Sequence, residues 1–106
     1  MGRKKYNQLK EYDQYNIKFY YGIPHCHTNF STGRGSPIEG YEYGYKAGLN
    51  FMFITDHNSF LSSEISIKDD KYSKFQGTKV YSSKIKKKYD EFLPLVGFEC
   101  KTYLYG

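Results

Sequence analysis

The sequence predicts a small α/β fold in which about three parallel strands alternate with helices. Residues 17–23, 50–55 and 95–98 are short segments rich in apolar and β-forming side chains, and the middle one is apolar enough for a strand covered on both faces. Residues 37–48 and 79–92 lie between these segments and carry apolar side chains at helical spacing. Strands that alternate with helices form parallel sheets, so we expect βαβ units with right-handed crossovers.

The composition limits the chain to one small domain. It has 106 residues, and aromatic residues make up 20% of them, which partly compensates for a hydrophobic content of 39%. No apolar run is long enough for a transmembrane helix, and the basic N-terminus lacks the apolar segment of a signal peptide. We therefore expect a cytoplasmic protein, with residues 1–16 as a loosely ordered polar leader and residues 17–106 as the domain.

The first helix has clear boundary signals. Ser36 suits the N-cap, Pro37 the first helical position and Glu39 a capping box. Gly48 suits the end of the helix. The face that can pack on a sheet consists of Ile38, Tyr41, Tyr45 and Leu49.

The segment from residue 58 to residue 77 has no clear period. It is Ser-rich and then charged, so we expect either a long loop or a loop with one short helix, with Gly77 as a break. We expect the second helix to follow this break and Pro94 to end it. The inner face of that helix would consist of Val80, Ile85, Tyr89 and Phe92.

A side chain able to bind metal follows each predicted strand. These are His25 and His27 after the first strand, His57 after the second and Glu99 after the third. A His-x-His pair alone also occurs in cores and on surfaces, but the carboxyl ends of parallel strands meet at one edge of a sheet, which favours a metal site. Imidazole and carboxylate ligands suit zinc, manganese or iron. Asp56 is a candidate to orient one imidazole by a hydrogen bond.

The two cysteines, Cys26 and Cys100, are too few for a disulfide framework. Alternate side chains of an extended segment share a face, so His25 and His27 point together and Cys26 points away. The same alternation separates Cys100 from Glu99. We expect two packed, free thiols that do not bind metal.

The net charge is +5, and the densest basic run is residues 84–88. A solvated helix face is the simplest interpretation of such a run. The alternative is electrostatic attraction of phosphate or nucleic acid, although no aromatic platform with a nucleic-acid motif accompanies the run.

Three motifs together resemble the PHP superfamily (polymerase and histidinol phosphatase). They are His-Cys-His-Thr-Asn-Phe-Ser at residues 25–31, Ile-Thr-Asp-His-Asn at residues 54–58 and Val-Gly-Phe-Glu at residues 96–99, and Ala-Gly-Leu at residues 47–49 leads into the second. The resemblance runs from Tyr20 to Lys101. Within the superfamily, the chain is most similar to stand-alone metal-dependent phosphoesterases.

This resemblance implies a distorted (β/α)7 barrel with a cluster of two or three divalent metal ions. His25 and His27 would bind one ion, Glu99 would bridge it to a second, and His57 would contribute to a third position. The implied reaction is hydrolysis of phosphomonoesters or short phosphodiesters by water that the metal ions activate. The resemblance leaves Thr28 and Asn58 as hydrogen-bonding residues at the strand ends.

The chain departs from the family pattern in two respects. Thr32-Gly33-Arg34 follow Ser31, where family members usually offer an Asp or His for the third metal. The family's later histidines and Asp-x-His pair have no counterpart, and a complete barrel takes on the order of 250 residues. We therefore expect residues 17–106 to be the N-terminal part of a PHP domain, inactive alone, with an open sheet edge that can pair with another chain.

Two other interpretations remain open at this point. The chain could be a degenerate, non-catalytic PHP piece that binds a partner chain or a polyanion through its basic, Tyr-rich surface. Alternatively, the Tyr and Lys content could reflect coding bias in a chain with a marginal fold and no present function.

Overall fold

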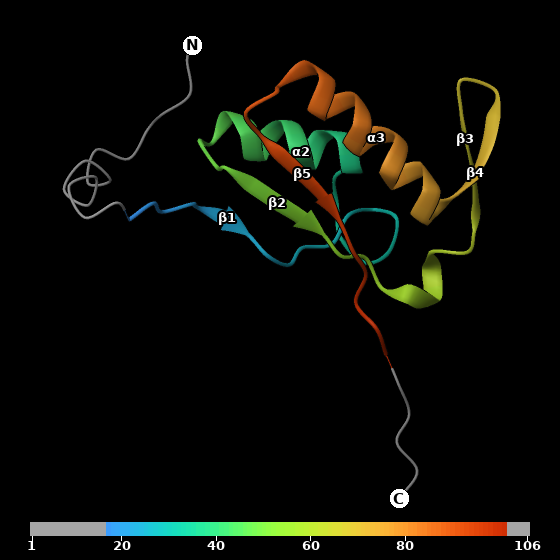
Figure 1. Cartoon of the computed structure of the whole chain (residues 1–106). Coiled ribbons are helices and arrows are strands. Elements are labelled where there is room, and N and C mark those ends of the chain that lie inside the picture. The colour runs from blue at the N-terminus through green and yellow to red at the C-terminus, as the bar shows by residue number, and fades with distance from the viewer. Residues whose placement is uncertain (1–16, 102–106) are drawn as a thin grey trace, which may run out of the picture.

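A parallel sheet of three strands, in the order β1-β2-β5, forms the centre of the computed structural model (Figure 1). The structure describes residues 17–101. The strands are β1 (Gly22–Ile23), β2 (Phe51–Ile54) and β5 (Leu93–Val96). Two helices, α2 (Pro37–Lys46) and α3 (Lys74–Lys88), connect them in sequence. The predicted α/β class is confirmed, and the predicted polar leader, residues 1–16, lies outside the described residues.

The start of α2 agrees with its sequence signals. The Ser36 hydroxyl accepts the backbone N–H of Glu39 at 3.3 Å and donates to the Glu39 carboxylate at 3.0 Å. This closes the N-terminal turn and satisfies one of the helix's unpaired donors. The helix ends at Lys46, two residues before Gly48, whose φ of 92° is a left-handed conformation that glycine adopts without strain.

The hydrophobic core lies between the sheet and the two helices, which cover the same face of the sheet (Figure 1). Helix α2 can approach strand β2 closely because residue 44 is glycine: a Cβ at this position would lie only 2.8 Å from the Met52 sulfur. A buried tyrosine hydroxyl is also satisfied here, since Tyr41 donates to the Leu95 carbonyl at 2.7 Å. The core cluster consists of Tyr41, Met52, Ile54, Ile85 and Phe92.

The opposite face of the sheet is apolar and not covered by either helix. Met52 and Ile54 are buried in the core, whereas Phe51 and Phe53 alternate with them and are only partly buried. The register places Leu93 beside Phe51 on this open face, and Leu93 is 48% exposed. The expectation that residues 50–55 form a strand covered on both faces is therefore wrong for the described part of the chain.

The first strand is much shorter than residues 17–23. The β2 ladder starts at Phe51, which pairs with Gly22, so the regular pairing of β1 covers Gly22 and Ile23 only. The strand still leads directly to the histidine motif, because Thr55 donates its backbone N–H to the Cys26 carbonyl at 2.8 Å beyond the named strands.

The segment after residue 57 contains a short helix, which was one of two expected alternatives, and an unexpected hairpin. The 3-10 helix η2 (Asn58–Phe60) is followed by antiparallel strands β3 (Glu64–Ile67) and β4 (Asp70–Ser73). Lys68 and Asp69, which form the turn, have φ of 49° and 71°, the positive values that a tight two-residue hairpin turn requires.

Gly77 does not separate a loop from the second helix, contrary to the prediction, but lies inside α3. A Cβ at this position would lie 2.3 Å from the Ile65 Cδ1 atom, so the glycine is where the hairpin packs closely on the helix. The helix begins at Lys74, where the Ser73 hydroxyl accepts the Gln76 N–H at 3.1 Å. It also ends at Lys88, earlier than predicted, so buried Phe92 follows the helix.

Contrary to the prediction, Pro94 does not end the helix. It lies within strand β5. Leu93, just before it, and Gly97, three residues after it, donate their N–H groups to the carbonyls of Asn50, just before β2, and of Ile54 in β2, each at 2.9 Å. Strand N–H groups alternate in direction, so the nitrogen of Pro94 faces away from β2. Proline is tolerated there because β5 is an edge strand among the described strands, and the missing donor makes that edge less able to pair with another chain.

Two lysines of the basic run at the end of α3, Lys86 and Lys88, make polar contacts within the molecule. The Lys86 ammonium donates to the carbonyls of Asp90 and Phe92, and Lys88 pairs with Glu42 at 2.8 Å. Cations at this end of a helix also complement its dipole. The run is thus a helix face with structural contacts. No helix in residues 17–101 combines the length and the apolar character needed to cross a membrane.

Candidate metal centre

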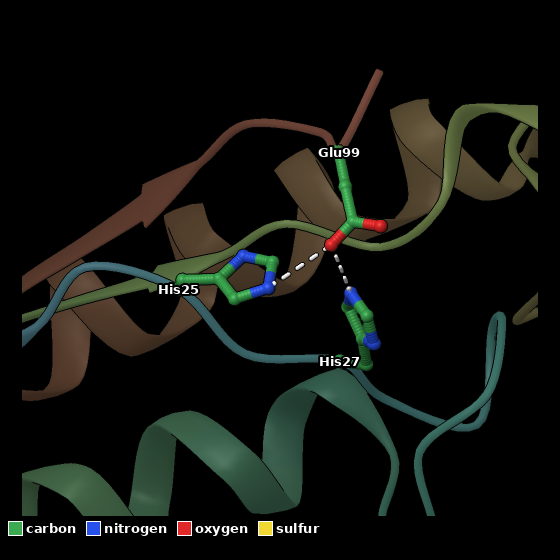
Figure 2. Close-up of side chains that lie close together, drawn as sticks. All are labelled: His25, His27 and Glu99. Carbon is green, nitrogen blue, oxygen red and sulfur yellow. Dashed lines mark hydrogen bonds and ion pairs between the residues drawn. The ribbon is translucent and has the colours of Figure 1, made fainter. Parts of the chain in front are cut away.

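Glu99 lies among the three histidines at the carboxyl ends of the parallel strands. Its Oε1 atom is 3.0 Å from His25 Nε2 and 3.2 Å from His27 Nε2, and Oε2 is 2.9 Å from His57 Nδ1. Figure 2 shows His25 and His27, from the segment after β1, pointing at Glu99 after β5. The potential ligand atoms of His25, His27 and Glu99 lie within 4.8 Å of one another. The four residues predicted from the sequence as metal ligands are therefore neighbours.

Backbone pairing beyond the strands explains why His57 and Glu99 meet. Strands β2 and β5 stay hydrogen-bonded past their ends: Glu99 N–H donates to the Asp56 carbonyl at 2.9 Å, and Asn58 N–H donates to the Glu99 carbonyl at 3.0 Å. This makes His57 and Glu99 a parallel bridge pair. Directly paired residues of adjacent strands present their side chains on the same face.

The cluster opens on the sheet face that the helices do not cover. Cys26 packs against the core on the helix side, and its thiol donates to the Phe53 carbonyl at 3.2 Å. The flanking His25 and His27 point the other way, as the alternation of an extended segment predicts. The His25 side chain is 55% exposed and that of Glu99 37%, so the cluster is accessible to solvent.

A threonine hydroxyl contacts the second nitrogen of each histidine after β1. Thr55 Oγ1 lies 2.6 Å from His25 Nδ1 and 3.3 Å from the Cys26 carbonyl oxygen, to which it can also donate. The tautomer of His25 decides which group donates in the shorter contact, and in either case the contact turns Nε2 of the ring toward Glu99. On the other histidine, Thr32 Oγ1 lies 3.0 Å from His27 Nδ1.

This donor set fits a divalent metal ion. Nitrogen atoms of three imidazoles lie within 3.2 Å of the two oxygens of one carboxylate, so four potential ligand groups lie together. Imidazole nitrogens with an adjacent carboxylate are ligands that zinc, manganese and iron accept. Hydrogen bonds to the remote ring nitrogens are the usual means by which proteins orient such ligands.

Asp56 does not orient an imidazole, contrary to the expectation. It is 1% exposed, and its carboxylate accepts the Thr28 N–H at 2.6 Å, the Thr28 hydroxyl at 2.7 Å and the Ser31 hydroxyl at 2.6 Å. The short distances are typical of hydrogen bonds to an ionised acceptor. The Asp56 carboxylate thus holds the loop that follows His27, and it acts on the cluster through that loop.

The same loop requires glycine at residue 33. A Cβ on Gly33 would lie 2.3 Å from the His27 carbonyl oxygen, because the loop folds back and the Gly33 N–H donates to the Thr28 carbonyl at 2.8 Å. This fold brings Thr32 to His27. In the sequence, Thr32 stood out only as a departure from the family's ligand pattern, and nothing in the pattern indicated its contact with an imidazole.

Both cysteines are free, as predicted. Burial, and then the nearby Asp56 carboxylate, raise the pKa of the Cys26 thiol from 9.0 to about 11. A neutral, inward-pointing thiol does not bind metal. Cys100 was expected to be packed but is exposed, and its sulfur accepts the Asn58 amide at 3.7 Å.

Comparisons of the chain with protein-family models, with curated proteins and with solved structures found no match. The interpretation of the cluster therefore depends on its own geometry and on the three sequence motifs.

Proposed function

We propose that the cluster is part of the metal site of a PHP-type phosphoesterase, which hydrolyses phosphomonoesters or short phosphodiesters. One observation carries the proposal: three imidazoles surround a single carboxylate at the carboxyl ends of parallel strands, within 3.2 Å of its oxygens. Active sites of parallel α/β folds form at this edge. Zinc, manganese or iron fits these ligands.

The two oxygens of Glu99 suggest how the ligands divide. His25 and His27 approach Oε1 and would hold one ion with it, whereas His57 approaches Oε2 and would belong to a neighbouring ion. A carboxylate between two such positions can bridge two metal ions. This division agrees with the resemblance to the PHP superfamily in that His25 and His27 share one ion, which Glu99 bridges to a second. It differs in that His57 would belong to the second ion and not to the third position that the resemblance implies. Thr32 contributes an orienting hydroxyl where that family usually has a third-site ligand.

Bound metal ions would supply a water molecule of lowered pKa and would neutralise charge on the phosphoryl oxygens. The chain's own residues prepare the site. Thr55 and Thr32 fix the orientation of His25 and His27, and Asp56 holds the loop that follows His27. The solvent-exposed side of His25 leaves a direction from which an anionic substrate can approach.

The proposal extends to the architecture. In (β/α) barrels, each strand turns one apolar face toward the barrel interior, and active-site residues lie at the carboxyl ends of the strands. The open sheet face, with Phe51, Phe53 and Leu95, leads to His57 and Glu99 in this manner. We therefore interpret the sheet as part of a distorted (β/α)7 barrel. The cluster itself offers one carboxylate and three imidazoles. We therefore expect residues 17–101 alone to bind metal weakly and to turn over little substrate.

The test begins with metal binding and then measures turnover. The chain is loaded with Mn²⁺ or Zn²⁺, and its metal content is measured by mass spectrometry beside a His25→Ala/His27→Ala variant. We expect the variant to lose the metal; equal content in both proteins would refute the site. Hydrolysis of an aryl phosphate by the wild-type chain that disappears in His27→Ala would show that the chain alone is active, against our expectation.

A non-catalytic module that binds a polyanion is the alternative. It predicts salt-sensitive binding that survives loss of all three histidines. The contacts of Lys86 and Lys88 within the molecule favour the metal-site proposal, because the densest basic run is already partly neutralised or engaged.

A further inference from the structure

Lys74 connects the segments that follow the two histidine motifs. Its ammonium donates to the Phe30 carbonyl at 3.1 Å and lies 5.9 Å from the centre of the Phe30 ring. It also lies 5.8 Å from the centre of the Phe60 ring. A cation at these distances is attracted to the face of each ring. One side chain of α3 therefore contacts both segments.

Each aromatic residue is tied to its histidine by the backbone. Phe60 closes η2, and its N–H donates to the His57 carbonyl at 3.1 Å. Phe30 follows His27 by three residues, and its N–H donates at 3.1 Å to the Thr28 hydroxyl that also binds Asp56. Displacement of either ring would thus be transmitted to a candidate metal ligand.

The position of Lys74 in its helix is otherwise unfavourable. It is the first residue of α3, where the partial positive charge of the helix dipole disfavours a cation, and the first turn contains no acidic residue. Within residues 17–101, the lysines that form ion pairs are Lys71 and Lys88, not Lys74. A residue that breaks a local rule without local compensation points to a role in the site.

We propose that Lys74 is a positioning residue that holds the His27 and His57 segments in register for metal binding. This inference rests on the proposed metal site, and it concerns how that site is kept in shape. The backbone of Lys74 supports the same junction, since its N–H donates to the Ser63 carbonyl at 2.8 Å and the next residue, Phe75, donates to the Leu61 carbonyl at 3.2 Å.

The experiment compares three variants of the whole chain. Lys74→Met keeps the length of the side chain without its charge, and Lys74→Arg keeps a cation and donors. Lys79→Met is the matched control, because the Lys79 ammonium lies over one ring only, 4.8 Å from the centre of Phe75. Zn²⁺ affinity is measured by competition with a chromophoric chelator. We expect about tenfold weaker binding for Lys74→Met, a typical effect of losing an orienting partner, and affinities near wild type for the other two.

Amide hydrogen exchange of the metal-free protein provides the second readout. Exchange of the Ser31 and Gly33 amides and of the Leu61 amide should accelerate together in Lys74→Met and stay unchanged in Lys79→Met. Wild-type Zn²⁺ affinity in Lys74→Met, or no rescue by Lys74→Arg, would overturn the proposal. If the wild-type chain binds no Zn²⁺, the proposed function fails and exchange alone decides: acceleration in both segments supports the coupling, and acceleration in one or neither refutes it.

Discussion

The Thr55 hydroxyl lies 2.6 Å from His25 Nδ1 and thereby determines which ring nitrogen faces Glu99. Thr55 follows β2 and His25 follows β1, so two neighbouring strand ends define one ligand. The hydroxyl also lies 3.3 Å from the Cys26 carbonyl oxygen, so it connects the imidazole to the backbone of the segment after β1. The orientation of the imidazole is thus set by contacts within the protein.

Replacement of Thr55 by valine should remove this control without changing the shape of the side chain. We expect Zn²⁺ affinity to fall by about 10- to 100-fold, since the ring loses the hydroxyl that orients it. Thr55→Ser should retain most of the affinity because it keeps the hydroxyl. Long-range ¹H–¹⁵N spectra of the metal-free protein should show a single tautomer of His25 in wild type and Thr55→Ser, and a mixture in Thr55→Val. An unchanged tautomer in Thr55→Val would show that the hydroxyl does not orient the ring.

Asp56 should be more important for stability than for metal binding itself. Its replacement by alanine leaves the Thr28 and Ser31 donors without their acceptor in a buried site, so we expect a loss of about 3–5 kcal/mol in the free energy of unfolding. Urea denaturation measures the change. Asp90→Ala is the control, because Asp90 is exposed and contributes only its backbone carbonyl to Lys86; it should change stability little. A small loss in Asp56→Ala would show that the loop is held by other contacts.

That His25, His27, His57 and Glu99 lie close together could be predicted, because their positions depend on the strand ends. A parallel sheet brings the carboxyl ends of its strands to one edge whatever their exact lengths, so His57 and Glu99 meet although β5 begins two residues earlier than expected. The role of Asp56 could not be predicted in this way. A carboxylate beside a histidine in the sequence points to the opposite side of the strand, and here it meets the loop after His27.

The hairpin was missed for a physical reason as well. Tight hairpin turns are recognised by glycine or asparagine, whereas here Lys68 and Asp69 adopt positive φ. Without the hairpin, Gly77 looks like a helix breaker, because its close approach to Ile65 depends on a partner that the local sequence does not indicate. Pro94 was likewise misjudged, since its tolerance depends on the edge position of β5.

Alanine at Gly77 should therefore destabilise the protein, although alanine favours helices. The added Cβ would lie 2.3 Å from Ile65 Cδ1, so the hairpin must shift, and we expect a net loss of about 1–3 kcal/mol. Gly40→Ala in α2 is the matched control, because the nearest atoms to its Cβ are 3.8 Å away. It should gain up to about 1 kcal/mol from helix propensity. Thermal unfolding of both variants tests the pair; stabilisation by both would mean that the hairpin does not pack on α3.

The two thiols should differ in reactivity and in their effect on the pH dependence of stability. A disulfide reagent at neutral pH should modify exposed Cys100 quickly and Cys26 only on unfolding, because a thiol with a pKa of about 11 is almost entirely protonated there. The folded pKa of Cys26 lies above the 9.0 of a free thiol, so the fold favours the neutral form. This contribution to stability is complete below pH 9.0 and is lost as the pH rises through about 11. Urea midpoints of Cys26→Ala should accordingly fall less steeply with pH in this range than those of Cys100→Ala; equal slopes would contradict the shift.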